Sequence, residues 1–167
     1  HSSITIVFGC GGDRDKDKRS IMGKIANNYC DKVFLTDDNP RYENPKKIRS
    51  QIKKKISRFK LVEIASREKA IKVAIESLNS GDILLVAGKG HEIYQEYKGK
   101  KNFFSDKKCI LKAINLKNKK LFKNWKANIL HEQCNLNSVS KDLKINKASI
   151  NSKNIKKNDI FFAIKGP

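Results

Sequence analysis

Cysteine is scarce in this sequence of 167 residues, and the four cysteines that it contains are widely separated. They form no CxxC pair, and none lies at zinc-ligand spacing from His91 or His131. We therefore expect neither a disulfide framework nor a structural zinc site. The pattern predicts free thiols, as in a cytosolic protein, at Cys10, Cys30, Cys109 and Cys134.

Long apolar runs are also missing. The longest, residues 4–8 and 83–87, have the length of a strand and fall far short of the roughly 20 residues that a membrane span needs. The N-terminus shows no signal-peptide pattern, so we expect a cytoplasmic protein without a membrane span. The chain opens with His1 directly before a predicted strand, and we expect it to be a piece of a longer protein.

Acidic residues are few, because 17 Asp and Glu stand against 37 Lys and Arg, which gives a formal net charge of +20. Such an excess is typical of a basic nucleic-acid-binding module, which we keep as an alternative. The lysines, however, are spread along the chain, and no basic stripe with interleaved aromatic residues is present. We therefore predict no nucleic-acid partner. An anionic substrate suits the same charge.

Strand-like and helix-like segments alternate through the first two-thirds of the chain. Strands are predicted at 4–8, 32–36, 61–64 and 83–87, the last being the most apolar and therefore the most buried. Helices are predicted at 19–28, with apolar positions 21, 22, 25 and 26 at helical spacing, from Asn44-Pro45, from Ser66 to a stop at Gly81, and from Ser105 to 114. Residues 93–104 predict a hairpin or short edge strands. This order predicts an α/β fold with a Rossmann-like, mostly parallel sheet and helices on both faces.

The composition changes after about residue 115, where a polar, lysine-rich stretch begins. We predict one domain at 1–116, a linker at 117–124 and the beginning of a second domain at 125–167. The second segment is expected to be α+β, with a helix near 122–134 and a strand at 160–164. Its apolar positions are too few for an independent core, so we interpret it as truncated.

Three polar segments each follow a predicted strand, and the loops at the carboxyl ends of parallel strands converge on one crevice. Residues 9–15 are rich in glycine, which lets the backbone approach a ligand closely, although they match neither GxGxxG nor a Walker loop. Residues 36–41 end in Arg41, whose planar guanidinium suits a carboxylate. Residues 87–92 end in Glu92, which suits an ammonium group. The alternatives are a structural glycine turn, a capped surface turn and a solvated charge cluster.

Two other features near these loops carry less functional weight. His91 lies within the third segment, but no second ligand is at useful spacing, so we predict no metal site. The aromatic residues around 94–95 and 103–104 favour packing in the sheet over a platform for stacking bases.

Taken together, these segments resemble the Mur ligases, specifically the branch that adds meso-diaminopimelate. Residues 7–16, Lys18-Arg19, Met22-Gly23, 36–41 and 87–92 occur in the order and approximate spacing of that branch, over about residues 3–115. The resemblance implies that the chain is the C-terminal, amino-acid-binding domain. It departs from the family at Ser20, where proline is usual.

The resemblance also implies a reaction. ATP, with Mg²⁺, phosphorylates the D-glutamate carboxylate of UDP-N-acetylmuramoyl-L-alanyl-D-glutamate, and the amine of meso-diaminopimelate then attacks the acyl phosphate. The family places ATP, Mg²⁺ and the nucleotide sugar mainly in preceding domains, including a central ATPase domain. We therefore expect an ATP-dependent amide-bond-forming ligase in peptidoglycan synthesis, with no catalytic residue and no activity in this fragment alone.

The roles of site residues carry over by position. Arg14 and Arg41 would bind carboxylates, Asp38 and Asn39 would orient that end of the substrate, and Gly88 and Glu92 would supply backbone and ammonium contacts. Lys16 and Lys18 would help to hold phosphate or ADP. The Asp38-Asn39-Pro40-Arg41 motif marks diaminopimelate users, and an enzyme adding lysine or another diamino acid remains the main alternative within the family. Outside the family, the alternative is a noncatalytic nucleotide-binding α/β domain.

The end of the chain has a resemblance of its own. Residues 149–153 and 155–167 are similar to the opening of a Mur ligase N-terminal, UDP-sugar-binding domain, that of the enzyme adding D-alanyl-D-alanine. The family usually has Asp-Ser-Arg where this chain has Asn151-Ser152-Lys153. The resemblance implies a bifunctional fusion of two ligases. The alternative is an unrelated tail.

Overall fold

The computed structural model describes residues 2–124, 147–149 and 159–161. The chain divides into two compact units, His1–Ile114 and Asn115–Pro167. The first unit holds every residue that the sequence assigns to the substrate site.

The first unit is built on a parallel sheet of four strands in the order β3-β2-β1-β4. The strands are β1 (Ile4–Phe8), β2 (Lys32–Leu35), β3 (Leu61–Glu63) and β4 (Ile83–Val86). In the centre of the sheet Val7 pairs with Phe34 of β2 and with Val86 of β4. The parallel α/β sheet predicted from the alternation of strands and helices is confirmed.

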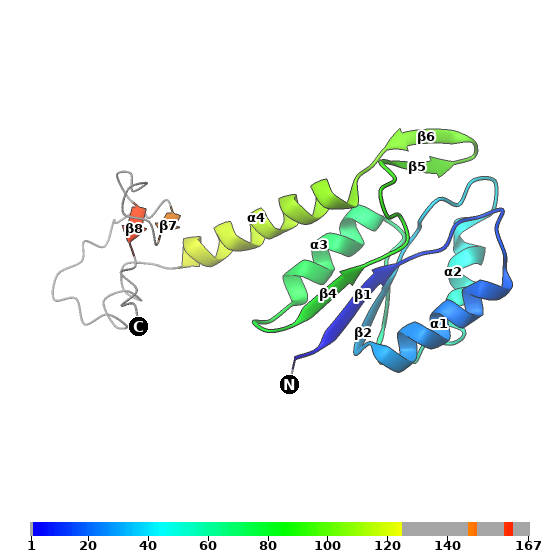
Figure 1. Cartoon of the computed structure of the whole chain (residues 1–167), viewed down its shortest axis with the longest axis horizontal. Helices are drawn as coiled ribbons and strands as arrows, with labels where there is room; N and C mark the ends of the chain where they lie inside the picture. Colours follow the sequence, from blue (N-terminus) through cyan, green and yellow to red (C-terminus); the bar gives the residue numbers. More distant parts are fainter. Residues whose placement is uncertain (1, 125–146, 150–158, 162–167) are drawn as a thin grey trace. The chain divides into compact units, whose positions relative to one another are not determined.

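Helices cover the two faces of the sheet (Figure 1). They are α1 (Asp17–Tyr29), α2 (Pro45–Lys53), α3 (Arg67–Ser77) and the first part of α4 (Asp106–Asn124). Because side chains alternate along a strand, Val33 and Leu35 pack with α1 and α2 on one face, whereas Phe34 packs with α3 on the other. Ala113 of α4 joins the second core, so each face has its own buried cluster.

Both predicted helix caps are present. The side chain of Asn44 accepts hydrogen bonds from the backbone N–H groups of Lys46 (2.9 Å) and Lys47 (3.3 Å), and Ser66 accepts one from Lys69 (3.3 Å). The predicted stop at Gly81 is wrong, because α3 ends at Ser77. Gly81 instead takes a φ of +88° in the turn that leads into β4.

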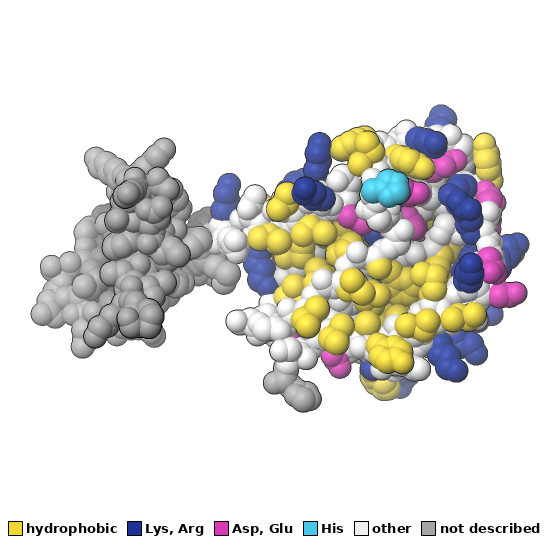
Figure 2. Space-filling view, viewed as in Figure 1, with side chains coloured by type: hydrophobic (Ala, Val, Ile, Leu, Met, Phe, Trp, Pro, Cys, Tyr) yellow, Lys and Arg dark blue, Asp and Glu magenta, His cyan; other side chains and the backbone are white. Residues whose placement is uncertain are grey.

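Strand β4 is not the most buried strand, contrary to the sequence-based prediction. It lies at the edge of the sheet, where Ile83 and Leu85 are 55% and 51% exposed on the face that α1 and α2 leave open. Ile21 and Ile25 of α1 are also exposed, although the helical spacing grouped them with the core positions. Apolar side chains therefore gather on this face of the unit (Figure 2).

A separate antiparallel hairpin follows β4. Of the two predicted arrangements for residues 93–104, a hairpin or short edge strands, the structure has the hairpin. Strands β5 (Tyr94–Tyr97) and β6 (Lys100–Phe103) pair with Tyr94 opposite Phe103. The turn consists of Lys98 and Gly99, which both have positive φ, at 49° and 73°. A pair of left-handed residues matches the twist of a two-residue hairpin, and this explains why glycine stands at the second position.

The second unit begins within α4, which continues to Asn124, so residues 117–124 are helical and not an irregular linker. Its other described elements are β7 (Lys147–Ser149) and β8 (Asp159–Phe161), which pair in parallel. Cys134, most of the helix predicted at 122–134 and part of the strand predicted at 160–164 lie outside the described residues. The domain boundaries stay predictions. Among the described helices, none has the length and apolarity to cross a bilayer.

A buried ion pair joins α3 to α4 and supplies a test of this packing. Both Nε and Nη2 of Arg67 donate to the carboxylate of Asp106, at 2.8 and 2.7 Å, and the side chain of Arg67 is fully buried. We expect Asp106→Ala to lower the free energy of unfolding by about 3 kcal/mol, because it leaves a buried guanidinium without its counter-ion.

The matched control is Glu68→Ala, which removes the exposed ion pair between Glu68 and Lys112. We expect that change to cost about 0.5 kcal/mol. Urea unfolding followed by circular dichroism measures both values. Equal losses in the two variants would contradict a structural role for the buried pair.

Candidate functional site

The sheet brings three strand ends to one edge of the first unit. Strands β1, β2 and β4 are parallel and in register, so the loops after Phe8, Leu35 and Val86 leave the sheet together. Strand β1 is followed by α1, which packs on one face of the sheet, whereas β4 is preceded by α3, which packs on the opposite face. Such a change of face between neighbouring strands is where α/β sheets bind ligands.

Glycines let the first loop dock on the second. The N–H of Gly12 donates to the carbonyl of Asn39 at 2.8 Å. A Cβ at Gly12 would lie 1.9 Å from the carbonyl oxygen of Pro40, and one at Gly9 would lie 2.3 Å from that of Thr36. No side chain fits at either position, so these glycines are required by the contact between the loops.

A cavity of about 430 Å³ opens beside the docked loops. Its lining combines residues from all three strand ends and the start of α1, namely Gly9, Cys10, Gly11, Arg14, Asp15, Lys18, Met22, Asp38 and Gly88. Burial raises the pKa of the Cys10 thiol to about 11, so this side chain stays protonated at neutral pH. The cavity therefore offers two cationic groups, Arg14 and Lys18, and two carboxylates, Asp15 and Asp38.

The two arginines predicted to bind carboxylates meet at Gly11. A Cβ on Gly11 would lie 2.9 Å from Nη1 of Arg41 and 3.6 Å from Cγ of Arg14. Arg41 is held in place, because its Nη1 donates to the carbonyl of Gly12 at 2.6 Å and its backbone takes a positive φ of 51°. Arg14 is exposed.

The acidic residues of the site come from the loops after β2 and β4. The side-chain amide of Asn39 donates to Oε2 of Glu92 at 2.7 Å. A Cβ at Gly88, whose φ is +110°, would lie 3.1 Å from Oδ2 of Asp38, so the absence of a side chain lets that carboxylate reach the loop. Oδ1 of Asp38 is buried and faces the ammonium group of Lys89, 3.2 Å away. The side chain of Asp38 also lines the cavity.

Lys89 was missed by the sequence analysis, which considered a solvated charge cluster at this segment. Its side chain is fully buried, and Nζ donates to Oδ1 of Asn39 at 2.9 Å and to the carbonyl of Tyr94 at 2.6 Å. It also lies 3.2 Å from Oδ1 of Asp38. The only feature of the sequence that could have indicated a special role for Lys89 is its position between Gly88 and Gly90, directly after a predicted strand.

The hairpin of β5 and β6 is hydrogen-bonded to the loop that carries Asp38, Asn39 and Arg41. The side-chain amide of Gln95 donates to the carbonyls of Asp37 and Asp38, at 3.2 and 2.9 Å. The backbone of Arg41 accepts from Lys98 N–H at 2.6 Å. The sequence analysis did not foresee this role, because it depends on contacts between segments that are far apart in the chain.

Asp37 has a structural role, unlike its neighbour Asp38. It accepts hydrogen bonds from Arg49 of α2 and, at 3.1 Å, from the hydroxyl of Tyr97. Burial, with Asp37 as the next cause, raises the pKa of Tyr97 above its usual range, so this hydroxyl remains a donor.

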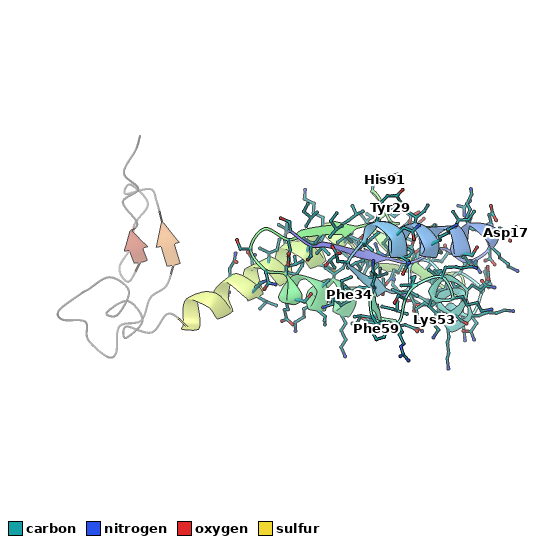
Figure 3. The ribbon with its side chains drawn as sticks, turned by 90° about the horizontal axis from the view of Figure 1, so that it is seen from below. Asp17, Tyr29, Phe34, Lys53, Phe59 and His91 are labelled. Carbon is teal, nitrogen blue, oxygen red and sulfur yellow. The ribbon has the colours of Figure 1, made fainter. Side chains whose placement is uncertain are left out.

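Not every predicted residue joins the site. Lys18 lines the cavity, but Lys16 does not, and Arg41 lines a neighbouring cavity of about 520 Å³ with Tyr97 and Lys98. His91 is exposed and lies at the rim of the unit (Figure 3). Within the described part of the chain, no group of three or more His, Cys, Asp or Glu side chains is placed to hold a metal ion.

The arrangement is suited to an amino acid. The guanidinium groups of Arg14 and Arg41 can pair with a carboxylate, and the carboxylates of Asp38 and Glu92 can accept from an ammonium group. The parallel sheet with helices on both faces defines a Rossmann-like α/β domain. A family model described as "Mur ligase, glutamate ligase domain" matches residues 1–90, and the chain belongs to this family.

Several curated relatives of the chain share one name. A UDP-N-acetylmuramoyl-L-alanyl-D-glutamate–2,6-diaminopimelate ligase of Rickettsia felis is 52% identical over 118 residues, which are 71% of this chain and 22% of that protein. The enzyme of the same name from Chlorobaculum tepidum is 50% identical over 109 residues, which are 65% of this chain and 22% of that protein. The chain thus spans less than a quarter of the length of these relatives.

A solved structure supports the same relationship. It is titled as a UDP-N-acetylmuramoyl-L-alanyl-D-glutamate–2,6-diaminopimelate ligase, and it matches with a TM-score of 0.66 and 42% identity. The match covers 70% of this chain and 24% of that one. The fold of the first unit is therefore the Mur ligase C-terminal domain fold.

A second ion pair supports the glycine-rich loop and makes the stability depend on pH. Arg19 of α1 is 1% exposed, and its two terminal nitrogens donate to both carboxylate oxygens of Glu43 at 2.9 and 2.8 Å. Arg19 also donates to the carbonyl of Gly11. The hydrogen bonds from Arg19 lower the pKa of Glu43 from 4.5 to about 2.

This pair predicts a loss of stability in acid. The pKa of Glu43 is lower in the folded chain than in the unfolded chain. The ionised carboxylate therefore contributes fully to the free energy of unfolding above pH 4.5, and this contribution is lost as the pH falls towards 2. We expect Glu43→Gln to be less stable than the parent chain at pH 7 and equal to it near pH 2. Urea unfolding across this range measures the difference, and a difference that does not change with pH would contradict the assignment.

Proposed function

We propose that the chain is the amino-acid-binding domain of an ATP-dependent ligase that joins meso-diaminopimelate to UDP-N-acetylmuramoyl-L-alanyl-D-glutamate in peptidoglycan synthesis. The observation that carries the proposal is that Arg14 and Arg41 both lie beside Gly11, while Asp38, which lines the same cavity as Arg14, shares the ammonium group of Lys89 with Glu92. The names of relatives that are about half identical support it.

The proposed site distinguishes diaminopimelate from lysine by a carboxylate. Both molecules have an ammonium group at the distal end, but only diaminopimelate has a carboxylate beside it. Arg41 is 20% exposed, donates to the carbonyl of Gly12 and lies 3.9 Å from Oε2 of Glu96. An analogue without that carboxylate would leave this partly buried guanidinium without its hydrogen-bonding partner on the substrate. Sites built around a polar partner reject analogues that lack it, because the penalty for an unpaired group is large.

The residues of the chain would bind and orient the distal end, leaving the other amine free to react. In the proposed reaction, ATP with Mg²⁺ phosphorylates the D-glutamate carboxylate, and this amine displaces phosphate from the acyl phosphate. The described residues form neither a Walker loop nor a metal site, so we assign this chemistry to other parts of a longer protein, including a central ATPase domain. Lys16 and Lys18, near the start of α1, would contribute to holding phosphate.

A second ligase activity is proposed for the same polypeptide. The resemblance of residues 149–167 to the opening of a D-alanyl-D-alanine-adding ligase supports it, although most of this segment lies outside the described residues. The complete reading frame tests the proposal. A Walker-type loop downstream of residue 167 is expected, and its absence would contradict the fusion.

The primary reaction is tested with the full-length protein. We expect tripeptide formation from ATP, Mg²⁺ and the UDP-muramyl dipeptide with meso-diaminopimelate, and a kcat/KM at least about a hundredfold lower with L-lysine. Arg41→Ala should lower kcat/KM for diaminopimelate by about a hundredfold, because it removes a charged hydrogen-bonding partner.

Two controls accompany this assay. Arg58→Ala removes an exposed arginine at the end of the segment after α2 and should leave kcat/KM unchanged. The 167-residue chain alone should form no tripeptide. Equal use of lysine and diaminopimelate would overturn the specificity, and no product with either would overturn the proposed reaction.

A further inference from the structure

Lys89 is the most completely buried cation of the site, and three different elements surround its ammonium group. It follows β4, it contacts Asn39 and Asp38 in the loop after β2, and it contacts Tyr94 at the start of the hairpin. Its Nζ also lies 3.7 Å from Oε2 of Glu92 and 5.8 Å from the centre of the Tyr94 ring. The ammonium group therefore ties together the two loops and the hairpin.

The contacts of Lys89 determine the orientation of the Asn39 side chain. Oδ1 of Asn39 accepts from Nζ of Lys89 at 2.9 Å and from the backbone N–H of Glu96 at 3.1 Å, so the amide nitrogen must point the other way. That nitrogen donates to Glu92 at 2.7 Å. The oxygen of an amide accepts and its nitrogen donates. By binding the oxygen of Asn39, Lys89 therefore directs the nitrogen towards Glu92.

We propose that Lys89 is a positioning residue for the ammonium end of the amino-acid substrate, an inference that rests on the proposed function. Lys89 acts through Asn39 to hold Glu92, and it holds the carboxylate of Asp38 from 3.2 Å away. Because Oδ1 of Asp38 faces Lys89 and the side chain lines the cavity, we assign the substrate contact to the other oxygen, Oδ2. Because Lys89 is fully buried among its partners, the substrate would contact the carboxylates of Asp38 and Glu92 and not Lys89 itself.

The charges agree with this role. Asp38 and Glu92 carry two formal negative charges and Lys89 carries one positive charge, so this half of the site has a net formal charge of −1 at neutral pH. That charge matches one ammonium group. Without Lys89, two carboxylates would stand together unpaired, which is costly for groups as buried as Asp38, which is 8% exposed.

The test uses the full-length ligase and two variants of similar side-chain size, Lys89→Met and Lys89→Gln. We expect Lys89→Met to raise KM for meso-diaminopimelate about tenfold, with KM for ATP unchanged, because the loss concerns one substrate only. Lys89→Gln should give an intermediate KM, because its amide can still donate to Asn39. Lys72→Met, at an exposed position of α3, is the matched control and should leave both KM values unchanged.

A double-mutant cycle shows whether Lys89 acts through Asn39. We expect Asn39→Ala combined with Lys89→Met to raise KM for diaminopimelate by clearly less than the product of the two single effects. Thermal melting of each variant checks that it is folded.

Several outcomes would overturn the proposal. They are an unchanged KM for diaminopimelate in a folded Lys89 variant, an equal rise in KM for ATP, or fully independent effects in the cycle. Failure of both Lys89 variants to fold would assign the residue to the fold and would also overturn it. A parent enzyme that makes no tripeptide from diaminopimelate would instead contradict the proposed function.

Discussion

The site depends on one contact, the docking of the glycine-rich loop after β1 on the loop after β2. The backbone hydrogen bond from Gly12 to Asn39 places the two loops against each other, and the carbonyls of Thr36 and Pro40 occupy the space where side chains would be. Arg41 reaches Gly11 only because the loops are this close. Buried ion pairs then fix each loop from outside, with Arg19 and Glu43 behind the first and Arg49 and Asp37 behind the second. Arg41 and Asn39 are thus held in place by contacts within the protein, and such preorganisation lowers the entropic cost of binding a ligand.

Much of this architecture could be predicted from local patterns. Short apolar runs alternating with amphipathic segments predicted the parallel sheet, and Asn44 and Ser66 marked two helix starts correctly because capping is a local interaction. The convergence of the three polar loops followed as well, since segments after neighbouring parallel strands leave the sheet at one edge. Of the predicted binding residues, Asn39 and Glu92 are in direct contact, and Arg14, Asp38 and Gly88 line one cavity. Their roles in binding substrate remain predictions.

Features that depend on long-range order could not be read from the sequence. The apolar run at 83–87 is compatible with a central or an edge strand, and only the strand order places it at the edge with Ile83 exposed. In the sequence, nothing distinguishes Lys89 from a surface lysine. It is buried because Asn39 and Tyr94, from other segments of the chain, accept hydrogen bonds from its ammonium group. The helical continuation of α4 through the lysine-rich stretch to Asn124 was missed because a polar segment was taken for a linker.

The central claim is that the three strand-end loops form one amino-acid site, and an NMR titration of the ¹⁵N-labelled chain with meso-diaminopimelate tests it most directly. The account predicts chemical-shift changes concentrated in residues 11–14, 38–41 and 88–92, with smaller changes for L-lysine around Arg41. Changes confined to other regions, such as the exposed apolar face of β4, or no changes at any soluble concentration, would contradict it.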